Sequence, residues 1–147
     1  FTLKSTKFEE VKNIDTLSLL HSDLFPENKN IPNKKQINSI AYLILMLNHP
    51  KIIQNDKDFL LNGTKRLNEK SEKQYAKLYN FLNYNQRQKL LKEIATTSWG
   101  ESFIADNLKF IFEAMLGDPI YGSNKDESGW IWLEHKAGLP RPKVAYL

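Results

Sequence analysis

The chain has 147 residues, of which 41% are hydrophobic and 12% aromatic, values that are typical of one folded domain and argue against disorder. The formal net charge is +4 and lysines alternate with acidic residues, which indicates a solvated helical surface and not the single-sign patch that nucleic-acid binding requires. The chain has no cysteine, which excludes disulfides, zinc held by thiolates, iron–sulfur ligation and covalent haem attachment.

Periodic apolar residues dominate the first 117 positions. Apolar side chains three or four positions apart predict helices over residues 8–20, 34–47, 56–70, 72–82 and 85–96. Prolines and asparagines in residues 25–35 separate the first two helices, His49 and the proline after it end the second, and Gly63 is a weak point in the third. Asn83 to Gln86 resembles a capping arrangement for the helix that follows.

The last long helix has the clearest boundaries. Ser98 and Glu101 match the Ser-x-x-Glu capping box, in which a hydroxyl and a carboxylate satisfy free backbone N–H groups. The apolar stripe that we assign to the core consists of Phe103 or Ile104, Leu108, Ile111, Phe112 and Met115. Gly117 is a natural residue for the end of this helix, because a proline two residues later prevents the helix from continuing.

These patterns predict an all-α fold. No period-two alternation typical of strands persists, and no internal repeat is present. We expect one domain over residues 1–147, with a helical body over 1–117 and an irregular tail rich in Gly, Pro and Trp over 118–147. The body should be a bundle of about five to six helices. The longest apolar run, residues 40–47, is far too short to span a bilayer.

The sequence offers no recognisable catalytic or cofactor-binding set. The three histidines, His21, His49 and His135, lie outside known motifs, and the first two fit helix-end positions. The glycines at 117, 122 and 129 lack the spacing of a phosphate-binding loop. We therefore predict no catalytic, cofactor-binding or metal-binding residue in this chain, with a catalytic histidine as the alternative.

A calcium loop is a further alternative. Asn124, Asp126 and Ser128 place side-chain oxygens at positions one, three and five of a loop with a glycine at six, as in a helix–loop–helix calcium site. The twelfth position is His135, where such a site needs a bidentate glutamate. A turn built from Asn, Asp and Gly explains the same residues, and a calcium-stabilised structural module would show a melting temperature that depends on calcium.

Aromatic side chains are concentrated in the tail. Tyr121, Trp130 and Trp132 lie in or beside its turns, and a tail this apolar either covers its own bundle or is covered by another protein. Both interpretations stay open, since Trp130 and Trp132 share a face on an extended segment but not on a helix. Asp118 and Asp126 are expected to cap turns. The candidates for a partner interface, or for organising the tail, are Tyr121, Asn124, Trp130, Trp132 and Pro140.

The tail also carries a family resemblance. Residues 118–133 read D-P-I-Y-G-S-N-K-D-E-S-G-W-I-W-L and residues 137–142 read A-G-L-P-R-P, which resembles the C-terminal signature of the gluconate 2-dehydrogenase subunit 3 family. Upstream, the segment FLNYNQRQKLLKEI at residues 81–94 and the early proline-bearing loop fit the order of features in that family. Ser123 departs from the second glycine that is usual there, so we expect a changed local turn, and residues 134–137 depart from a usual small or glycine-bearing stretch.

The resemblance implies a role as a partner subunit. Such proteins are small subunits of periplasmic, membrane-associated flavoprotein dehydrogenases, in which a large subunit binds FAD and a multihaem cytochrome c subunit passes electrons onward. The small subunit usually carries a twin-arginine export signal and supports the export and maturation of the large subunit. The resemblance therefore implies no cofactor in this chain, FAD and haem c in its partners, and a periplasmic location at the inner membrane. A first residue Phe1 fits a processed or trimmed chain.

We therefore predict a non-catalytic small subunit of a gluconate 2-dehydrogenase complex. It would bind the FAD-containing large subunit through the tail and the adjoining helix face. Two alternatives stay open: a small subunit of a related glucose, fructose or polyol dehydrogenase, and a stand-alone enzyme with an unrecognised site.

Overall fold

The structure is a computed structural model that describes the backbone of residues 2–145 and the side chains of residues 13–145. Its α-helices are α1 (Thr2–Leu24), α2 (Lys34–Ile37), α3 (Ser39–Asn48), α4 (Gln54–Tyr75), α5 (Tyr84–Ala95), α6 (Ser98–Leu116) and α7 (Ser128–Trp132). Single 3₁₀ turns are η1 (Tyr79–Phe81), η2 (Pro119–Tyr121) and η3 (Lys125–Glu127). This part of the chain contains no strand, so the predicted all-α fold is confirmed. None of its helices is both long enough and apolar enough to cross a membrane.

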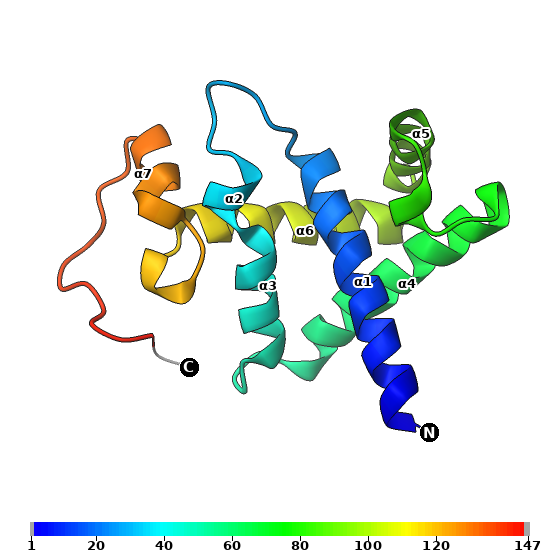
Figure 1. The fold of residues 1–147 in the computed structure, drawn as a ribbon, viewed down its shortest axis with the longest axis horizontal. Helices are drawn as coiled ribbons and strands as arrows, with labels where there is room; N and C mark the ends of the chain where they lie inside the picture. Colours follow the sequence, from blue (N-terminus) through cyan, green and yellow to red (C-terminus); the bar gives the residue numbers. More distant parts are fainter. Residues whose placement is uncertain (1, 146–147) are drawn as a thin grey trace.

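Helix α6 is the axis around which the other helices pack. It contacts α1, α3, α4, α5 and α7, and in Figure 1 it passes behind α1 and α3. Its N-terminal half enters the main core, where Phe103 is surrounded by buried leucines of α1, α3, α4 and α5. Its C-terminal half enters a second, smaller core. There Ile111, Ala114 and Met115 of α6 cluster with Ile37 of α2. One helix therefore connects two separate apolar clusters.

A buried ion pair ties α1 to the rest of the body. Arg87 on α5 donates from Nε to Asp23 Oδ2 (2.7 Å) and from Nη2 to Asp23 Oδ1 (3.1 Å). The hydroxyl of Tyr79 in η1 donates to the same carboxylate at 2.6 Å. Only 4% of the Asp23 side chain and 14% of the Arg87 side chain is exposed. Since two donors share one buried carboxylate, losing it would remove the acceptor of the Tyr79 hydroxyl and leave Arg87 with only its bond from Nη1 to the carbonyl of Leu82.

The helix predicted over residues 56–70 is present within α4, but the break after it and most of the helix predicted over 72–82 are wrong. Residues 56–70 and 72–82 do not form separate helices, because α4 runs unbroken until Ala76, which has a left-handed backbone with φ of 56°. The chain then folds back as η1, and the N–H of Tyr79 donates to Asn68 Oδ1 at 3.1 Å. The bond to the buried side chain of Asn68 thus stabilises a 3₁₀ turn where periodicity predicted a second helix.

Gly63 is a close-packing site and not a weak point. It is buried in the middle of α4, and a Cβ at this position would lie 2.3 Å from Cδ2 of Phe103. Glycine costs a helix about 0.5–1 kcal/mol relative to alanine. Here that cost is offset by the close approach of α4 and α6.

Other boundaries also differ from the predictions. The predicted helix over 34–47 is divided into α2 and α3 by Asn38, whose φ of 49° is one that asparagine tolerates. The helix predicted over 8–20 extends in both directions as α1, and the tail predicted to be irregular contains η2, η3 and α7. The cap predicted at Asn83 and Gln86 is confirmed as a reciprocal capping box at the start of α5.

Helix α6 begins with a different cap from the one predicted. Thr97, and not Ser98, is the N-cap residue, and its Oγ1 accepts a hydrogen bond from the N–H of Gly100 at 3.1 Å. The same hydroxyl donates to the carbonyl of Ile94 at 2.6 Å. The Thr97 hydroxyl therefore caps both the C-terminus of α5 and the N-terminus of α6. Ser98, one residue later, is not placed to make both bonds.

Candidate functional site

Asn124 holds the C-terminal end of the molecule together. Its side chain is fully buried; Nδ2 donates to the carbonyl of Gly117 (2.9 Å) and Oδ1 accepts from the N–H of Gly129 (2.7 Å). Its own N–H donates to the carbonyl of Ile37 (3.1 Å). Its φ of 50° is left-handed, a conformation that asparagine adopts more readily than most residues. One residue thus joins the end of α6, the start of α7 and the end of α2.

Trp130 closes the end of α6 from the inside. Only 6% of it is exposed, and its indole N–H donates to the carbonyl of Leu116 at 2.7 Å. The last carbonyl groups of a helix lack partners within the helix, so this bond acts as a side-chain cap. The guanidinium of Arg141 lies 4.9 Å from the centre of the indole ring and covers it from outside.

Arg141 fastens the extended segment that follows α7. It donates to both oxygens of Asp118 (3.1 and 3.3 Å) and also bonds the carboxylate of Glu127. The hydrogen bond from Arg141 and, to a smaller extent, the one from the N–H of Ile120 hold the pKa of Asp118 below its usual range. Asp118 also caps η2 through this second bond (3.0 Å), as predicted, whereas η3 has no side-chain cap and Asp126 itself takes a left-handed backbone.

The expected change at Ser123 is not present in its own backbone. The residues with positive φ are its neighbours, Gly122 (89°) and Asn124 (50°), so a serine between them is unstrained. Ser123 is 1% exposed, and its hydroxyl has no hydrogen-bond partner among the described residues.

The calcium alternative loses support from the same contacts. The side-chain oxygen Oδ1 of Asn124, which would be the first ligand, already accepts from the N–H of Gly129 inside the turn. Within residues 13–145, no group of three or more His, Asp or Glu side chains lies together as a metal site would need. The Asn/Asp/Gly turn accounts for this loop.

Trp132 belongs to a set of apolar side chains, three exposed and one (Phe25) half-buried, which we call the aromatic surface: Phe25, Phe112, Leu116 and Trp132. The ring of Phe25 meets Phe112 edge-on (centroids 6.0 Å apart) and Trp132 edge-on (6.2 Å). Exposed fractions are 43% for Phe112, 46% for Leu116 and 37% for Trp132, so the prediction of Phe112 as a core residue is wrong. Because Trp130 and Trp132 lie on a helix, one ring faces inward and the other faces this surface.

A groove lies beside the aromatic surface at the end of α6 and shares Leu116 with it. It runs between α3 and the turn after α6, which are neighbours in Figure 1, and has a volume of about 460 Å³. Tyr121 lies in its wall, and the hydroxyl of Tyr42 donates to Glu113 Oε2 (2.9 Å) inside it. Burial and this carboxylate raise the pKa of Tyr42 well above its usual range, so the phenol stays a donor. The residues on its two sides lie far apart in the sequence; Tyr42 and Glu113, for example, are 71 positions apart. No local sequence pattern therefore indicates the groove.

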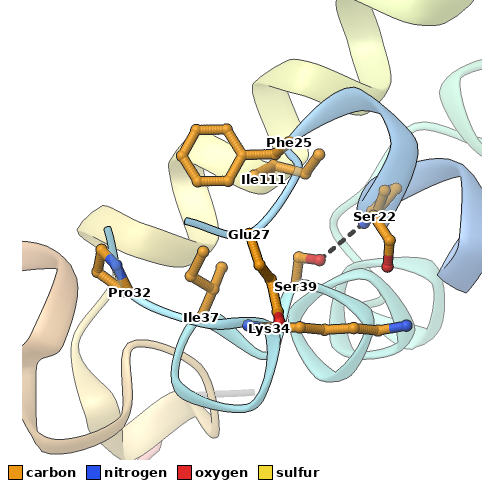
Figure 2. Close-up of a pocket in the computed structure, with 9 residues that line it drawn as sticks. Ser22, Phe25, Glu27, Pro32, Lys34, Ile37, Ser39 and Ile111 are labelled. Atoms are coloured by element: carbon orange, nitrogen blue, oxygen red, sulfur yellow. Dashed lines mark hydrogen bonds between the residues drawn. The ribbon is translucent and has the colours of Figure 1, made fainter. Parts of the chain in front are cut away.

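A buried polar cluster joins three helices near the middle of α6. His21 is 4% exposed; its Nδ1 lies 2.8 Å from Ser39 Oγ and its Nε2 lies 3.1 Å from Asn107 Oδ1. The amide nitrogen of Asn107 donates to Phe103, so its oxygen accepts from Nε2–H and leaves Nδ1 to accept from Ser39. Burial lowers the pKa of His21 to about 4, and the bond to Asn107 offsets this only in part. Figure 2 shows Ser39 with its hydrogen bond as a dashed line.

This cluster has the donor pattern of a serine nucleophile and its base, which the sequence did not reveal. A serine within hydrogen-bond reach of a histidine is the arrangement that nucleophilic catalysis needs. However, Ser39 is 8% exposed and the adjoining cavity of about 20 Å³ holds about one water molecule. The arrangement therefore links α1, α3 and α6, and His21 is a core residue in the last turn of α1.

The five predicted tail residues are thus in different positions. Asn124 and Trp130 lie inside and organise the tail, whereas Trp132 lies on the aromatic surface and Tyr121 in the groove wall. Pro140 is exposed on the extended segment that Arg141 fastens. The structure does not bring all five together on one surface.

A comparison with known protein families finds a match that spans both the helical body and most of the tail. The family model described as gluconate 2-dehydrogenase subunit 3 matches residues 12–137, which include the helical body, Asn124 and both tail tryptophans. No curated protein and no solved structure matches the chain. Since the match covers most of the sequence, the chain belongs to the gluconate 2-dehydrogenase subunit 3 family.

Proposed function

We propose that this chain is a non-catalytic small subunit of a membrane-associated flavoprotein gluconate dehydrogenase. In that complex it supports the export, maturation and stability of the FAD-containing large subunit, and a cytochrome c subunit carries the electrons onward. The family describes a dehydrogenase subunit, which supports a place in a complex of several chains. The periplasmic location, the twin-arginine export and the haem c of the third subunit follow from the same resemblance.

The observation that carries the proposal is the aromatic surface at the end of α6. Phe112, Leu116 and Trp132 are each exposed by more than a third, and Phe25 holds two of the rings in edge-on contact. Grouped apolar side chains on a soluble domain mark sites of protein contact, and tryptophan is enriched among the residues that dominate binding energy. Asn124 and Trp130 fix the backbone beneath these rings, so the surface is preorganised.

Trp132 is the sharpest residue with which to test this role. The chain and the FAD-containing large subunit would be co-expressed, and the amount of large subunit retained by the tagged chain would be measured. Truncating an interface tryptophan typically costs about 2 kcal/mol or more, so Trp132→Ala should reduce retention strongly. Phe81→Ala is the matched control, because Phe81 is an aromatic residue that is 68% exposed and lies in η1, outside the aromatic surface. Equal retention for both variants would contradict the role of the aromatic surface.

A separate assay tests the non-catalytic part of the proposal. The purified chain alone should not oxidise gluconate, glucose, fructose or sorbitol with an artificial electron acceptor, whereas the complex should oxidise one of them. Activity of the isolated chain would favour the stand-alone enzyme instead. Trp130→Ala is unsuitable for the binding assay, because this buried ring caps α6 and its loss would disturb the fold.

A further inference from the structure

The groove between α3 and the end of α6 combines an apolar floor with negative charge. Leu45, Met46 and Leu116 line it together with the carboxylates of Glu113 and Asp118. Two helices also end here, and neither α3 nor α6 has a basic residue in its last turn. The carbonyl end of a helix carries roughly half a negative charge, but Trp130 donates to the end of α6 and Lys57 to the end of α3, so the negative charge of the groove comes from its carboxylates. On a chain with a formal charge of +4, this groove is a local acidic site.

The cations already near the groove pair with one of its two carboxylates and leave the other weakly paired. Arg141 bonds both oxygens of Asp118, so Glu113 is the lining carboxylate that remains for another cation. Lys109 lies 3.8 Å from Glu113, but 69% of its side chain is in solvent, where such a pair contributes little. Lys57 donates to the carbonyl of His49 (3.1 Å) at the outer end of α3.

Glu113 is also held in one orientation. Its Oε2 accepts from the hydroxyl of Tyr42, and its side chain is 37% exposed, so the carboxylate is partly removed from water at a fixed position. A fixed, partly desolvated carboxylate binds a cation more strongly than a mobile surface one, because less ordering is needed. The remaining oxygen faces a weak lysine contact that a better-placed cation can replace.

We propose that this groove binds a segment of the large subunit in which a lysine or arginine, flanked by apolar residues, pairs with Glu113. The inference rests on the proposed function and adds the place and the chemistry of the contact. Leu116 belongs both to the groove and to the aromatic surface, so the two form one continuous face around the end of α6. The aromatic rings supply apolar contact, and the groove supplies the charge that sets the register.

A competition experiment tests the groove separately from the proposed function. Wild-type and variant chains with different tags are co-expressed with a limiting amount of the large subunit, and the ratio of the two chains in the purified complex is measured. Glu113→Lys should be disfavoured by at least about tenfold, and Glu113→Gln, which can still accept from Tyr42, by a few-fold. Glu69→Lys is the matched control on the exposed face of α4 and should compete equally with wild type.

The outcomes separate the two proposals. If the wild-type chain retains the large subunit and both Glu113 variants compete equally with it, the groove proposal is overturned and the proposed function stands. If the wild-type chain does not retain the large subunit, the proposed function itself fails and the groove proposal fails with it. Loss of complex should also occur at lower salt for Glu113→Gln than for wild type, since one attractive contact is missing. Thermal melts of the isolated variants check that they remain folded.

Discussion

The two halves of α6 have different surroundings. Around Phe103 and Asn107, neighbouring helices cover the side chains completely, and polar groups are paired inside. Around Phe112 and Leu116, one side of the helix packs on a small core while the other is left 43% and 46% exposed. The first half completes its own burial, whereas the second leaves apolar surface open. The first half of α6 thus contributes to the stability of the body, and the second half carries the surface for which we propose partner binding.

The largest expected effect is in the body, at the buried carboxylate. Asp23→Ala would leave Arg87 and Tyr79 without their shared acceptor, and breaking such a pair typically costs about 3–5 kcal/mol. The free energy of unfolding, measured by urea denaturation, should fall by that amount. Asp23→Asn keeps one acceptor oxygen and should lose less. A change below about 1 kcal/mol for Asp23→Ala would mean that α1 does not depend on this pair.

The next effect is a dependence of stability on pH. Because burial lowers the pKa of His21 to about 4 from a usual 6.5, the unfolded chain binds a proton at pH values where the folded chain does not. The free energy of unfolding should therefore decrease as the pH falls from about 6.5 to about 4, by at most about 3 kcal/mol. Denaturation at pH 7.5 and pH 4.5 measures the change, and His21→Gln should reduce it. The same slope in both proteins would assign it to other groups.

A smaller effect is expected at the C-terminal end, from Asn124. Asn124→Gly keeps a left-handed backbone but removes the side-chain bonds to Gly117 and Gly129, at a cost of about 2 kcal/mol. Fluorescence of Trp130 and hydrogen exchange around α7 should report the loosening first. If the two halves of α6 are as different as their surroundings indicate, exchange in the body should stay slow. Equal loosening of both halves would contradict the division.

Local features of this fold were predictable from the sequence. The capping box at Asn83 and the cap at Asp118 depend on residues two or three positions away, so a short motif contains all the necessary information. The breaks at Asn38 and Ala76 were missed, because single left-handed residues leave helical periodicity almost unchanged. Thr97 and Ser98 are both residue types that cap helices, so the sequence does not distinguish them. Thr97 is the cap because its hydroxyl also reaches the carbonyl of Ile94 near the end of α5.

The candidate sites depended on contacts that no local pattern contains. Trp130 and Trp132 are the same residue type in the same segment, and only the position of α7 against α6 makes one a cap and the other exposed. The partners of His21 lie 18 and 86 positions away in the sequence, so its burial could not be read from its neighbours. The family, in contrast, was predictable, because the tail signature is itself a sequence pattern.

The bond between Asn124 and Ile37 has a consequence for the order in which the protein is completed. Synthesis proceeds from the N-terminus, and α2 and α6 precede Asn124 in the chain. Until residues 124 and 130 have emerged, the carbonyls of Ile37, Leu116 and Gly117 lack the partners that later satisfy them. The body can fold before these residues are made, whereas the face around Leu116 is assembled after them. A partner that recognises this face would therefore distinguish chains that contain residues 124–132 from chains that stop before them.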